Sequence, residues 1–266
     1  NHYNAANKPI VISNACISGV SAFVVAKEML QRGEYRHVIV AGGDALREFI
    51  TSGFASFKSI SPQPCRPYDA ERDGLTLGEA AGAVILTTDA ELAEKPHIRL
   101  AGGAVSNDAN HISGPSRTGD GLYFAINNAM DEAGVTGDAI GFVNTHGTAT
   151  RYNDEMESKA IAWAGLDNKP INSLKGYIGH TLGASGVVEA IACIEELRQG
   201  YIFGTKGFTS SDTPHELRLS ASTQQATGRC CVKTASGFGG CNAAIVLDME
   251  EREPCVQDGN RTSRVV

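Results

Sequence analysis

A repeated segment places the strongest constraint on the fold of this chain. Residues 17–33, ISGVSAFVVAKEMLQRG, align without gaps with residues 184–200, ASGVVEAIACIEELRQG, and six of the seventeen positions are identical. Both copies have Ser-Gly-Val near the start, end at a glycine and carry apolar residues at helical spacing. The repeat therefore predicts a duplicated fold, with one such helix in each of two related halves.

The strands and helices expected around the two copies support this division. The first copy has strands expected at 10–13, 36–41 and 81–88, with a polar loop between the last two. The second half has strands expected at 98–105, 140–145, 170–174, 230–236 and 242–248, and helices at 120–133, 154–164 and 184–199. We expect residues 1–96 to be the C-terminal part of a first half, 97–250 a complete second half, and 251–266 an unpaired polar tail. The first half would then be truncated, as in a piece of a longer protein.

Composition excludes several classes of protein. Of the 266 residues, 42% are hydrophobic and 20% charged, which is typical of a folded chain with a large core. A net charge of −7 argues against non-specific nucleic-acid binding, and no apolar run approaches a membrane span. The seven cysteines form no CxxC pair, so we expect neither a zinc site nor a disulfide framework. No targeting segment is recognisable, which predicts a cytoplasmic protein.

Cys16 is the first candidate for chemistry. It lies in SNACISGV (13–20), at the turn between an expected strand and the first repeat helix. The positive end of a helix dipole lowers the pKa of a thiol in that place, and the free N–H groups there can bind an oxyanion. The segment therefore predicts a nucleophilic thiolate, while a buried inert cysteine fits the same local pattern.

Two histidines follow expected strands of the second half. His146 lies in NTHGTAT (144–150), and His180 lies in the glycine-rich KGYIGHTLGASG (175–186), directly before the second repeat helix. A lone histidine usually has a structural role. Because a duplicated α/β fold brings such strand ends together around a cleft, we expect both histidines to face Cys16. A glycine-rich turn, GFGGCN (237–242), would allow close backbone approach to a ligand.

In this order and spacing, the segments resemble the β-ketoacyl-acyl-carrier-protein synthases of the thiolase superfamily, from about residue 9 to 248. Four motifs carry the resemblance: ACISG (15–19), CRPYDAERDGLTLGEAAG (65–82), THGTAT (145–150) and KGYIGHTLGASG (175–186). The combination of one cysteine and two histidines resembles the elongating type. The resemblance implies a thiolase-like duplicated α/β fold, layered α/β/α/β/α, with the first half truncated.

The resemblance also implies catalytic roles. Cys16 would carry the acyl group as a thioester, and its backbone N–H would form half of an oxyanion hole. His146 and His180 would hold the malonyl thioester carbonyl during decarboxylation and stabilise the enolate. Lys175 would act electrostatically, paired with Glu157.

Further residues are implied to bind the substrate. Phe238, which follows Gly237, would supply the second oxyanion-hole N–H and would gate the acyl pocket. Thr148 and Thr150 would bond the phosphopantetheine arm. Lys58, in GFASFKSIS (53–61), stands where the family carries an arginine that docks the carrier protein.

The implied reaction is a decarboxylating Claisen condensation. An acyl group on the cysteine would condense with malonyl-acyl carrier protein to give 3-oxoacyl-acyl carrier protein, in fatty acid, polyene or polyketide synthesis. Besides the phosphopantetheine of the carrier, no cofactor and no metal is expected. The expected assembly is a homodimer, or a heterodimer with a related subunit.

Two alternatives and one departure from the family accompany this prediction. A non-catalytic partner subunit resembling a chain length factor would typically lack the cysteine that is present here as Cys16. A cysteine hydrolase would leave one histidine and Lys175 without a role. In TASGFGGCN (234–242), Ser236 replaces a family phenylalanine, which puts the family's gate and acyl preference in question.

Overall fold

Ten strands and eight helices are seen in the computed structural model, which describes residues 7–250 and 263–265. The strands are β1 (His37–Asp44), β2 (Ala80–Thr87), β3 (Ile98–Asn107), β4 (Ile140–Asn144), β5 (Ile171–Asn172), β6 (Tyr201–Ile202), β7 (Gln224–Gln225), β8 (Cys230–Gly237), β9 (Cys241–Met249) and β10 (Ser263–Val265). The helices are α1 (Ser18–Gln31), α2 (Glu48–Ser56), α3 (Asp120–Ala133), α4 (Arg151–Trp163), α5 (Lys175–Ile178) and α6 (Ser185–Gln199), with short 3-10 helices η1 (Gly137–Ala139) and η2 (Leu182–Ala184).

Eight of these strands form one mixed sheet. Its order is β1-β2-β10-β3-β9-β8-β4-β5, and β6 and β7 form a separate antiparallel pair. The pairs β1–β2 and β8–β9 are antiparallel, whereas β4 runs parallel to both β5 and β8. Each half therefore has a helix followed by an antiparallel strand pair: α1 with β1 and β2, and α6 with β8 and β9.

The central strand β9 is buried on both faces. Ile245 and Leu247 pack in a core with α1 and α6, while Ala244 and Val246 pack in a second core with α3. Successive side chains of a strand point to opposite faces, so a strand covered on both sides must be apolar along its length. This explains the uninterrupted apolar run near the C-terminal end of the second half.

The two repeat helices pack against each other with reciprocal contacts. A Cβ atom on Gly19 of α1 would lie 2.7 Å from the backbone nitrogen of Val187, and one on Gly186 of α6 would lie 2.4 Å from that of Val20. The alignment pairs Gly19 with Gly186 and Val20 with Val187. The glycine of each copy thus lies against the valine of the other copy, as a pseudo-twofold axis requires. The predicted duplication is confirmed.

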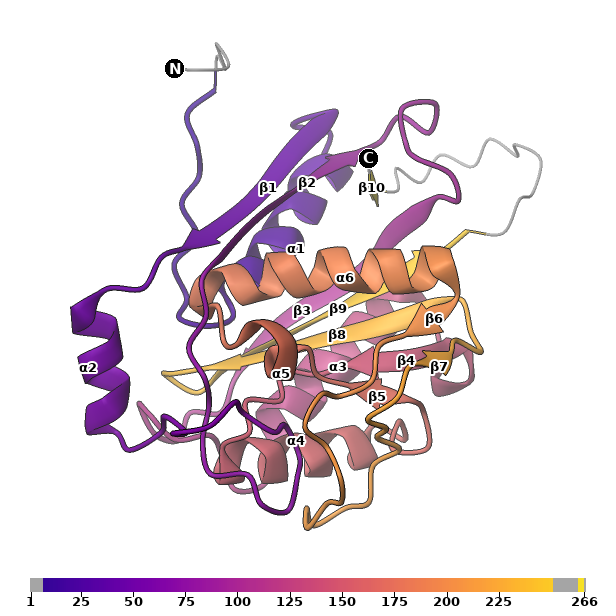
Figure 1. Cartoon of the computed structure of the whole chain (residues 1–266). Coiled ribbons are helices and arrows are strands. Elements are labelled where there is room, and N and C mark those ends of the chain that lie inside the picture. Colours follow the sequence, from indigo (N-terminus) through magenta and orange to yellow (C-terminus); the bar gives the residue numbers. More distant parts are fainter. Residues whose placement is uncertain (1–6, 251–262, 266) are drawn as a thin grey trace.

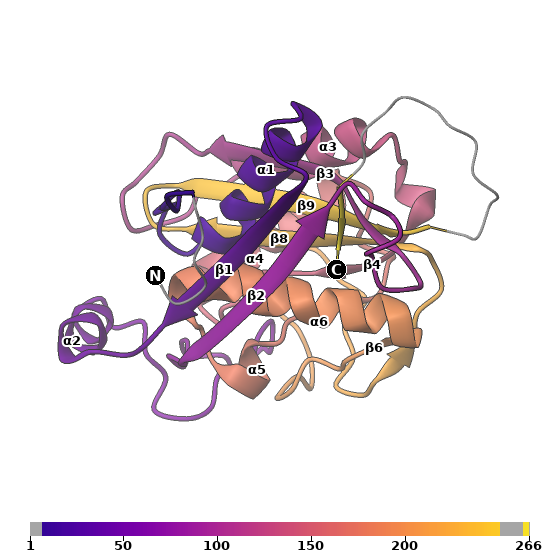
Figure 2. The same cartoon turned by 90° about the horizontal axis from the view of Figure 1, so that it is seen from above.

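The elements lie in layers. Figure 1 shows α1 and α6 between the β1–β2 part of the sheet above and its β3, β9, β8, β4 and β5 part below, with α3 and α4 beneath the lower part. Strand β10 joins the two parts. Figure 2, from above, shows β1 and β2 crossing over the two repeat helices. Four of the five expected layers are therefore present in the described residues, and the outer face of β1–β2 has no helix over it there.

Three sequence-based predictions differ from the structure. Residues 10–13 form no strand, and Ile10 and Val11 are 59% and 83% exposed, because no described strand lies beside them. The loop expected between β1 and β2 contains α2, whose side chains are not buried and which projects from the body (Figure 2). Of the expected unpaired tail, 251–262 and 266 lie outside the described residues, but Ser263–Val265 pair with β2 and β3 as β10.

Candidate active site

Cys16 lies in a tight turn just before α1. Ala15 has a φ of 45°, a left-handed conformation that costs energy for a residue with a side chain. The backbone therefore turns sharply immediately before Cys16. The turn is held by Ser18, whose hydroxyl donates to the carbonyl of Ala15 (2.6 Å) and accepts from the N–H of Asn14 (2.8 Å). The Cys16 side chain is buried.

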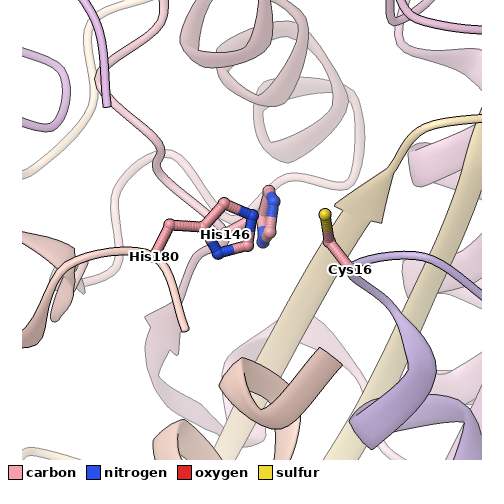
Figure 3. Close-up of side chains that lie close together, drawn as sticks. All are labelled: Cys16, His146 and His180. Atoms are coloured by element: carbon pink, nitrogen blue, oxygen red, sulfur yellow. The ribbon is translucent and has the colours of Figure 1, made fainter. Parts of the chain in front are cut away.

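His146 and His180 lie opposite the thiol, as expected from the sequence. Their ring centroids are 5.0 Å apart and the rings are nearly perpendicular, at 85°. Figure 3 shows Cys16 facing the two imidazoles, and donor atoms of the three side chains lie within 4.8 Å of one another. All three residues are buried. The structure therefore brings together a nucleophile from the first half and two imidazoles from the second.

Glu157 holds the turn that carries His146. Its carboxylate accepts the backbone N–H groups of His146 (2.9 Å) and Gly147 (2.6 Å), as well as the hydroxyl of Tyr68 (2.9 Å). Each oxygen of Glu157 thus already has an uncharged donor. The carboxylate positions the backbone of the histidine, which differs from the expected pairing with Lys175.

Lys175 instead pairs with Glu189 of α6. Its ammonium nitrogen lies 2.6 Å from Oε1 of Glu189, and both side chains are fully buried. The other oxygen, Oε2, lies 2.7 Å from Nζ of Lys233, which is also fully buried. The prediction that Lys175 pairs with Glu157 is wrong, because α6 positions the carboxylate of Glu189 next to the ammonium group of Lys175. Sequence reasoning did not select Glu189 or Lys233.

His180 is fixed from both its backbone and its ring. Its N–H donates to the carbonyl of Thr76 (2.6 Å), and its carbonyl accepts the N–H of Gly78 (3.0 Å). Ring atom Nδ1 lies 3.0 Å from the hydroxyl of Ser185, the first residue of α6. Since Nδ1 is engaged there, Nε2 is the ring nitrogen left for chemistry.

Burial and nearby charge set the protonation of the site. Burial, together with the positive charge of Lys175, holds the pKa of both His146 and His180 well below the usual range, so both rings are neutral. Burial raises the pKa of Cys16 to about 11, against the opposing effects of Lys175 and of the backbone N–H of Phe238. The expected lowering of the thiol pKa is therefore wrong for this resting state, since desolvation outweighs the charge of Lys175 and the backbone N–H groups that favour the thiolate.

The turn between β8 and β9 closes the site on the side of the thiol. A Cβ on Gly237 would lie 3.0 Å from the backbone nitrogen of Cys16, so a larger residue would crowd the nucleophile. The N–H of Phe238 acts on the Cys16 sulfur, as does the N–H of Cys16 itself. Two backbone N–H groups therefore lie beside the sulfur, close to where the oxygen of a thioester formed on Cys16 would develop negative charge.

Aromatic rings line the approach to the cysteine. The ring of Phe238 stacks on Phe54 and meets Phe57 edge-on, both at 5.5 Å between centroids. Phe54 belongs to α2 and Phe57 follows it directly, and neither was selected from the sequence. They line a cavity of about 430 Å³ with Cys16 and both histidines.

The remaining predicted residues line the same cavity. The hydroxyls of Thr148 and Thr150 lie 2.8 Å apart, and Lys58, just after α2, is exposed. Ser236 also lies there and donates to Asn242 (2.8 Å), which in turn donates to Asp108 (2.7 Å). The serine that replaces a family phenylalanine thus begins a polar network in the cavity wall.

The cysteine and the two histidines could also hold a metal ion by spacing alone. The ammonium charges of Lys175 and Lys233 act on the histidines, however, and oppose the binding of a metal cation there. The arrangement suits a developing negative charge better.

Comparisons with known proteins place these features in a family. One model, "Beta-ketoacyl synthase, N-terminal domain", matches residues 2–91, and another, "Beta-ketoacyl synthase, C-terminal domain", matches 97–209. The 3-oxoacyl-[acyl-carrier-protein] synthase 2 of Vibrio cholerae is 34% identical over 260 residues, which cover 90% of this chain and 61% of that protein. The chloroplastic 3-oxoacyl-[acyl-carrier-protein] synthase I of Hordeum vulgare is 32% identical over 250 residues, covering 89% and 54%.

Solved structures agree. The ketosynthase in complex with its chain length factor from Xenorhabdus doucetiae has a TM-score of 0.83 and 33% identity, over 90% of this chain and 59% of that one. A β-ketoacyl synthase from Burkholderia phymatum has a TM-score of 0.84 and 29% identity, over 90% and 61%. The chain thus spans about 60% of the length of several of these relatives. The expected thiolase-like fold is confirmed, and no helix in the described part of the chain could cross a membrane.

Proposed function

Because the chain belongs to the β-ketoacyl synthase family, we propose that it carries the catalytic residues of a 3-oxoacyl-[acyl-carrier-protein] synthase. The reaction is a decarboxylating Claisen condensation between a cysteine-bound acyl group and a malonyl group on acyl carrier protein. One observation carries the proposal: the Cys16 sulfur lies opposite two buried imidazoles and beside the N–H of Phe238. A cysteine hydrolase needs only one of those rings.

The first step is acyl transfer to Cys16. Its sulfur attacks the carbonyl carbon of the acyl thioester, and the carbonyl oxygen becomes an anion that accepts the N–H groups of Cys16 and Phe238. The bond to the pantetheine sulfur then breaks, and that sulfur leaves with the proton that Cys16 loses. Because burial raises the pKa of Cys16, this proton moves during the attack and not before it.

The second step is decarboxylation and condensation. The malonyl group loses CO2, and the electron pair of the broken bond enters an enolate whose oxygen accepts hydrogen bonds from His146 and His180. The enolate carbon attacks the Cys16 thioester, and the carbon–sulfur bond breaks to give the 3-oxoacyl-carrier product. Cys16 regains one proton from solvent. Neutral rings suit this role, since each retains one N–H to donate. No cofactor is required beyond the phosphopantetheine of the carrier.

A carrier protein is the proposed partner. One similar structure is described as an acyl-carrier protein in complex with its ketosynthase. In this chain the exposed Lys58 lies at the rim of the cavity, where a positive charge would meet an acidic partner. Inside, the hydroxyls of Thr148 and Thr150, which line the cavity, would bond the amide groups of the pantetheine arm.

A dimer is the proposed assembly. The apolar Ile10 and Val11, which precede the nucleophile, are largely exposed and could pair with the same segment of a second copy. Similar structures include a ketosynthase bound to its chain length factor, so a related subunit is the other candidate mate. Sedimentation of the full-length protein alone would give a dimer mass for the first arrangement and a monomer for the second. Relatives include bacterial and chloroplastic proteins, so the cytoplasmic location stays a prediction.

A non-catalytic partner subunit is the alternative function. Similar structures include chain-length-factor complexes, but Cys16 and both histidines meet here in reactive geometry, which a shaping subunit does not need.

The test is product analysis with the full-length protein, acyl-carrier protein and malonyl-carrier protein. We expect mass spectrometry to show a 3-oxoacyl-carrier product lengthened by two carbons, with a transient acyl adduct on Cys16. The Cys16→Ala variant should lose both the adduct and the product. Free acid as the main product would instead indicate a hydrolase, and turnover that needs an added related subunit and persists when Cys16 is replaced by alanine would indicate the partner role.

A further inference from the structure

Lys233 is a charged residue on a face of β8 that otherwise belongs to the hydrophobic core. Cys231 and Ala235, which share this face by the alternation of the strand, pack in the core with α1 and α6. Lys233 itself is fully buried. An ammonium group in such a place is unfavourable unless it is paired and hydrogen-bonded.

The lysine is one end of a buried triad. Nζ of Lys233 lies 2.7 Å from Oε2 of Glu189, and Nζ of Lys175 lies 2.6 Å from Oε1 of the same carboxylate. Both ammonium groups and the carboxylate are shielded from water. Two positive charges and one negative charge leave one positive charge in excess.

Lys233 also contacts the backbone next to a histidine. Nζ donates to the carbonyl of Thr234 (2.6 Å) and, at 3.5 Å, to the carbonyl of Thr145. Thr145 immediately precedes His146, and β4 pairs with β8 at this level, Asn144 opposite Lys233. The ammonium group therefore lies between α6 and the turn that carries His146.

The excess charge acts on both imidazoles. Burial and the charge of Lys175 lower the pKa of both histidines most, and the charge of Lys233 lowers it further. At His146, the neighbouring ring of His180 also lowers the pKa, more than Lys233 does. Other titratable groups near the triad and the site are Glu157 at the backbone of His146, Cys65 at the backbone of Lys175, Asp44 and Cys16 near the start of α1, and Cys193, Cys231 and Glu196 near Lys233. The pKa of Cys16, which burial raises, is lowered by the charge of Lys175.

We propose that Lys233 is a positioning residue of this site: through Glu189 it fixes Lys175, and through Thr145 it supports the turn of His146. Its charge then lies behind the histidine pair, on the side away from the substrate. In the proposed condensation this keeps both rings as neutral N–H donors and favours the enolate oxygen in front of them. The catalytic consequence rests on the proposed function, but the effect on the histidines does not.

The first experiment measures the histidines directly. In the full-length protein labelled at histidine Cε1, NMR titrations of wild type and of Lys233→Gln are compared; glutamine can still donate to backbone carbonyls but carries no charge. We expect the pKa of both site histidines to rise toward the usual range in the variant, because a nearby positive charge is lost. A Lys233→Met variant should behave alike, and one of the two suffices if the other does not fold.

A matched control removes another buried lysine. Lys27 of α1 is also fully buried and pairs with Glu132, outside the active-site cavity. Lys27→Met should cost comparable stability and leave the titration of His146 and His180 unchanged. Equal shifts in both variants, or no shift in folded Lys233 variants, would overturn the proposal.

The second experiment measures chemistry. Decarboxylation of malonyl-carrier protein by Lys233→Gln should fall about ten- to a hundredfold, with its acid limb moved to higher pH, while Lys233→Arg should recover part of the rate. Alkylation of Cys16 should change less than in Lys175→Met. An unchanged pH profile with a lowered rate would mean a purely structural lysine. If no variant and no wild type decarboxylates but the NMR shifts appear, the proposed function fails and the positioning role stands.

Discussion

The two copies of the repeat use the same helix and hairpin for different tasks. In the first copy, α1 follows the nucleophile, and the hairpin β1–β2 is interrupted by a long connection that contains α2. In the second copy, α6 follows His180 and contributes Glu189, and β8–β9 are joined by the short turn at Phe238. One copy thus supplies the thiol and the rim of the cavity. The other supplies both donor rings, the buried charges and the second N–H of the oxyanion hole.

Burial differs in the same way. The hairpin β8–β9 is packed on both faces, while in β1–β2 only one face is covered: Val40 and Val84 are buried, but Ile39 is 68% exposed. The buried charges beside the histidines, Lys175, Glu189 and Lys233, lie in the second copy, where the strands are packed on both faces. The difference indicates that rigid positioning is concentrated there, and access in the first copy.

The largest expected effect tests this division of labour. Replacing either His146 or His180 by alanine should lower malonyl decarboxylation by about 10²–10³-fold, since each removes one donor to the enolate. Acylation of Cys16 from acyl-carrier protein should persist, because its oxyanion donors are backbone N–H groups. The rate of decarboxylation is measured by the CO2 released. Acylation is measured by the increase in mass of the intact protein. Retained decarboxylation in both variants would contradict the assignment of the second copy.

Stability should separate the two hairpins. Ile245→Ala in β9 removes a fully buried side chain and should cost about 2–5 kcal/mol of unfolding free energy. Ile39→Ala in β1 removes an exposed one and should stay within about 0.5 kcal/mol. Urea unfolding of the 266-residue chain measures both. Equal losses would mean that the outer face of β1–β2 is also covered.

The thiol offers a test by pH. With a pKa of about 11, Cys16 should react with iodoacetamide about tenfold faster for each pH unit between 7 and 9, as the small thiolate fraction grows. Cys16→Ala gives the background from the other cysteines. A rate that levels off below pH 8 would show that the start of α1 lowers the pKa after all.

The smallest effect concerns the rim. Lys58→Glu should weaken the apparent affinity for acyl carrier protein a few-fold to about tenfold, and less at high salt, since an exposed charge pair contributes only about 0.2–1 kcal/mol. Turnover of a small pantetheine thioester should hardly change. Equal losses with both substrates would indicate that Lys58 supports the pocket and not the partner.

Motifs and periodicity predicted the main helices, the central strands and the meeting of Cys16 with His146 and His180. These features depend on local patterns: helical spacing, apolar strands and turn residues placed at strand ends. The α2 helix was missed although Ile50, Phe54 and Phe57 recur at helical spacing, because it is only nine residues long and is continuous with a polar, proline-containing loop. The strand expected at 10–13 is absent because a strand exists only when another strand pairs with it.

Partner choice among buried charges was decided only by the tertiary structure. Lys175 could reach Glu157 or Glu189 as far as sequence distance is concerned, but Glu157 already accepts N–H groups from the His146 turn, and α6 presents Glu189. The thiol pKa followed the same rule: the sequence predicted a helix start beside Cys16, while the packing around it removed water and raised the pKa. The sequence by itself determined which residue types could react and where their elements begin. Solvation and charge neighbours depend on chains packed from afar, and only the folded molecule decides them.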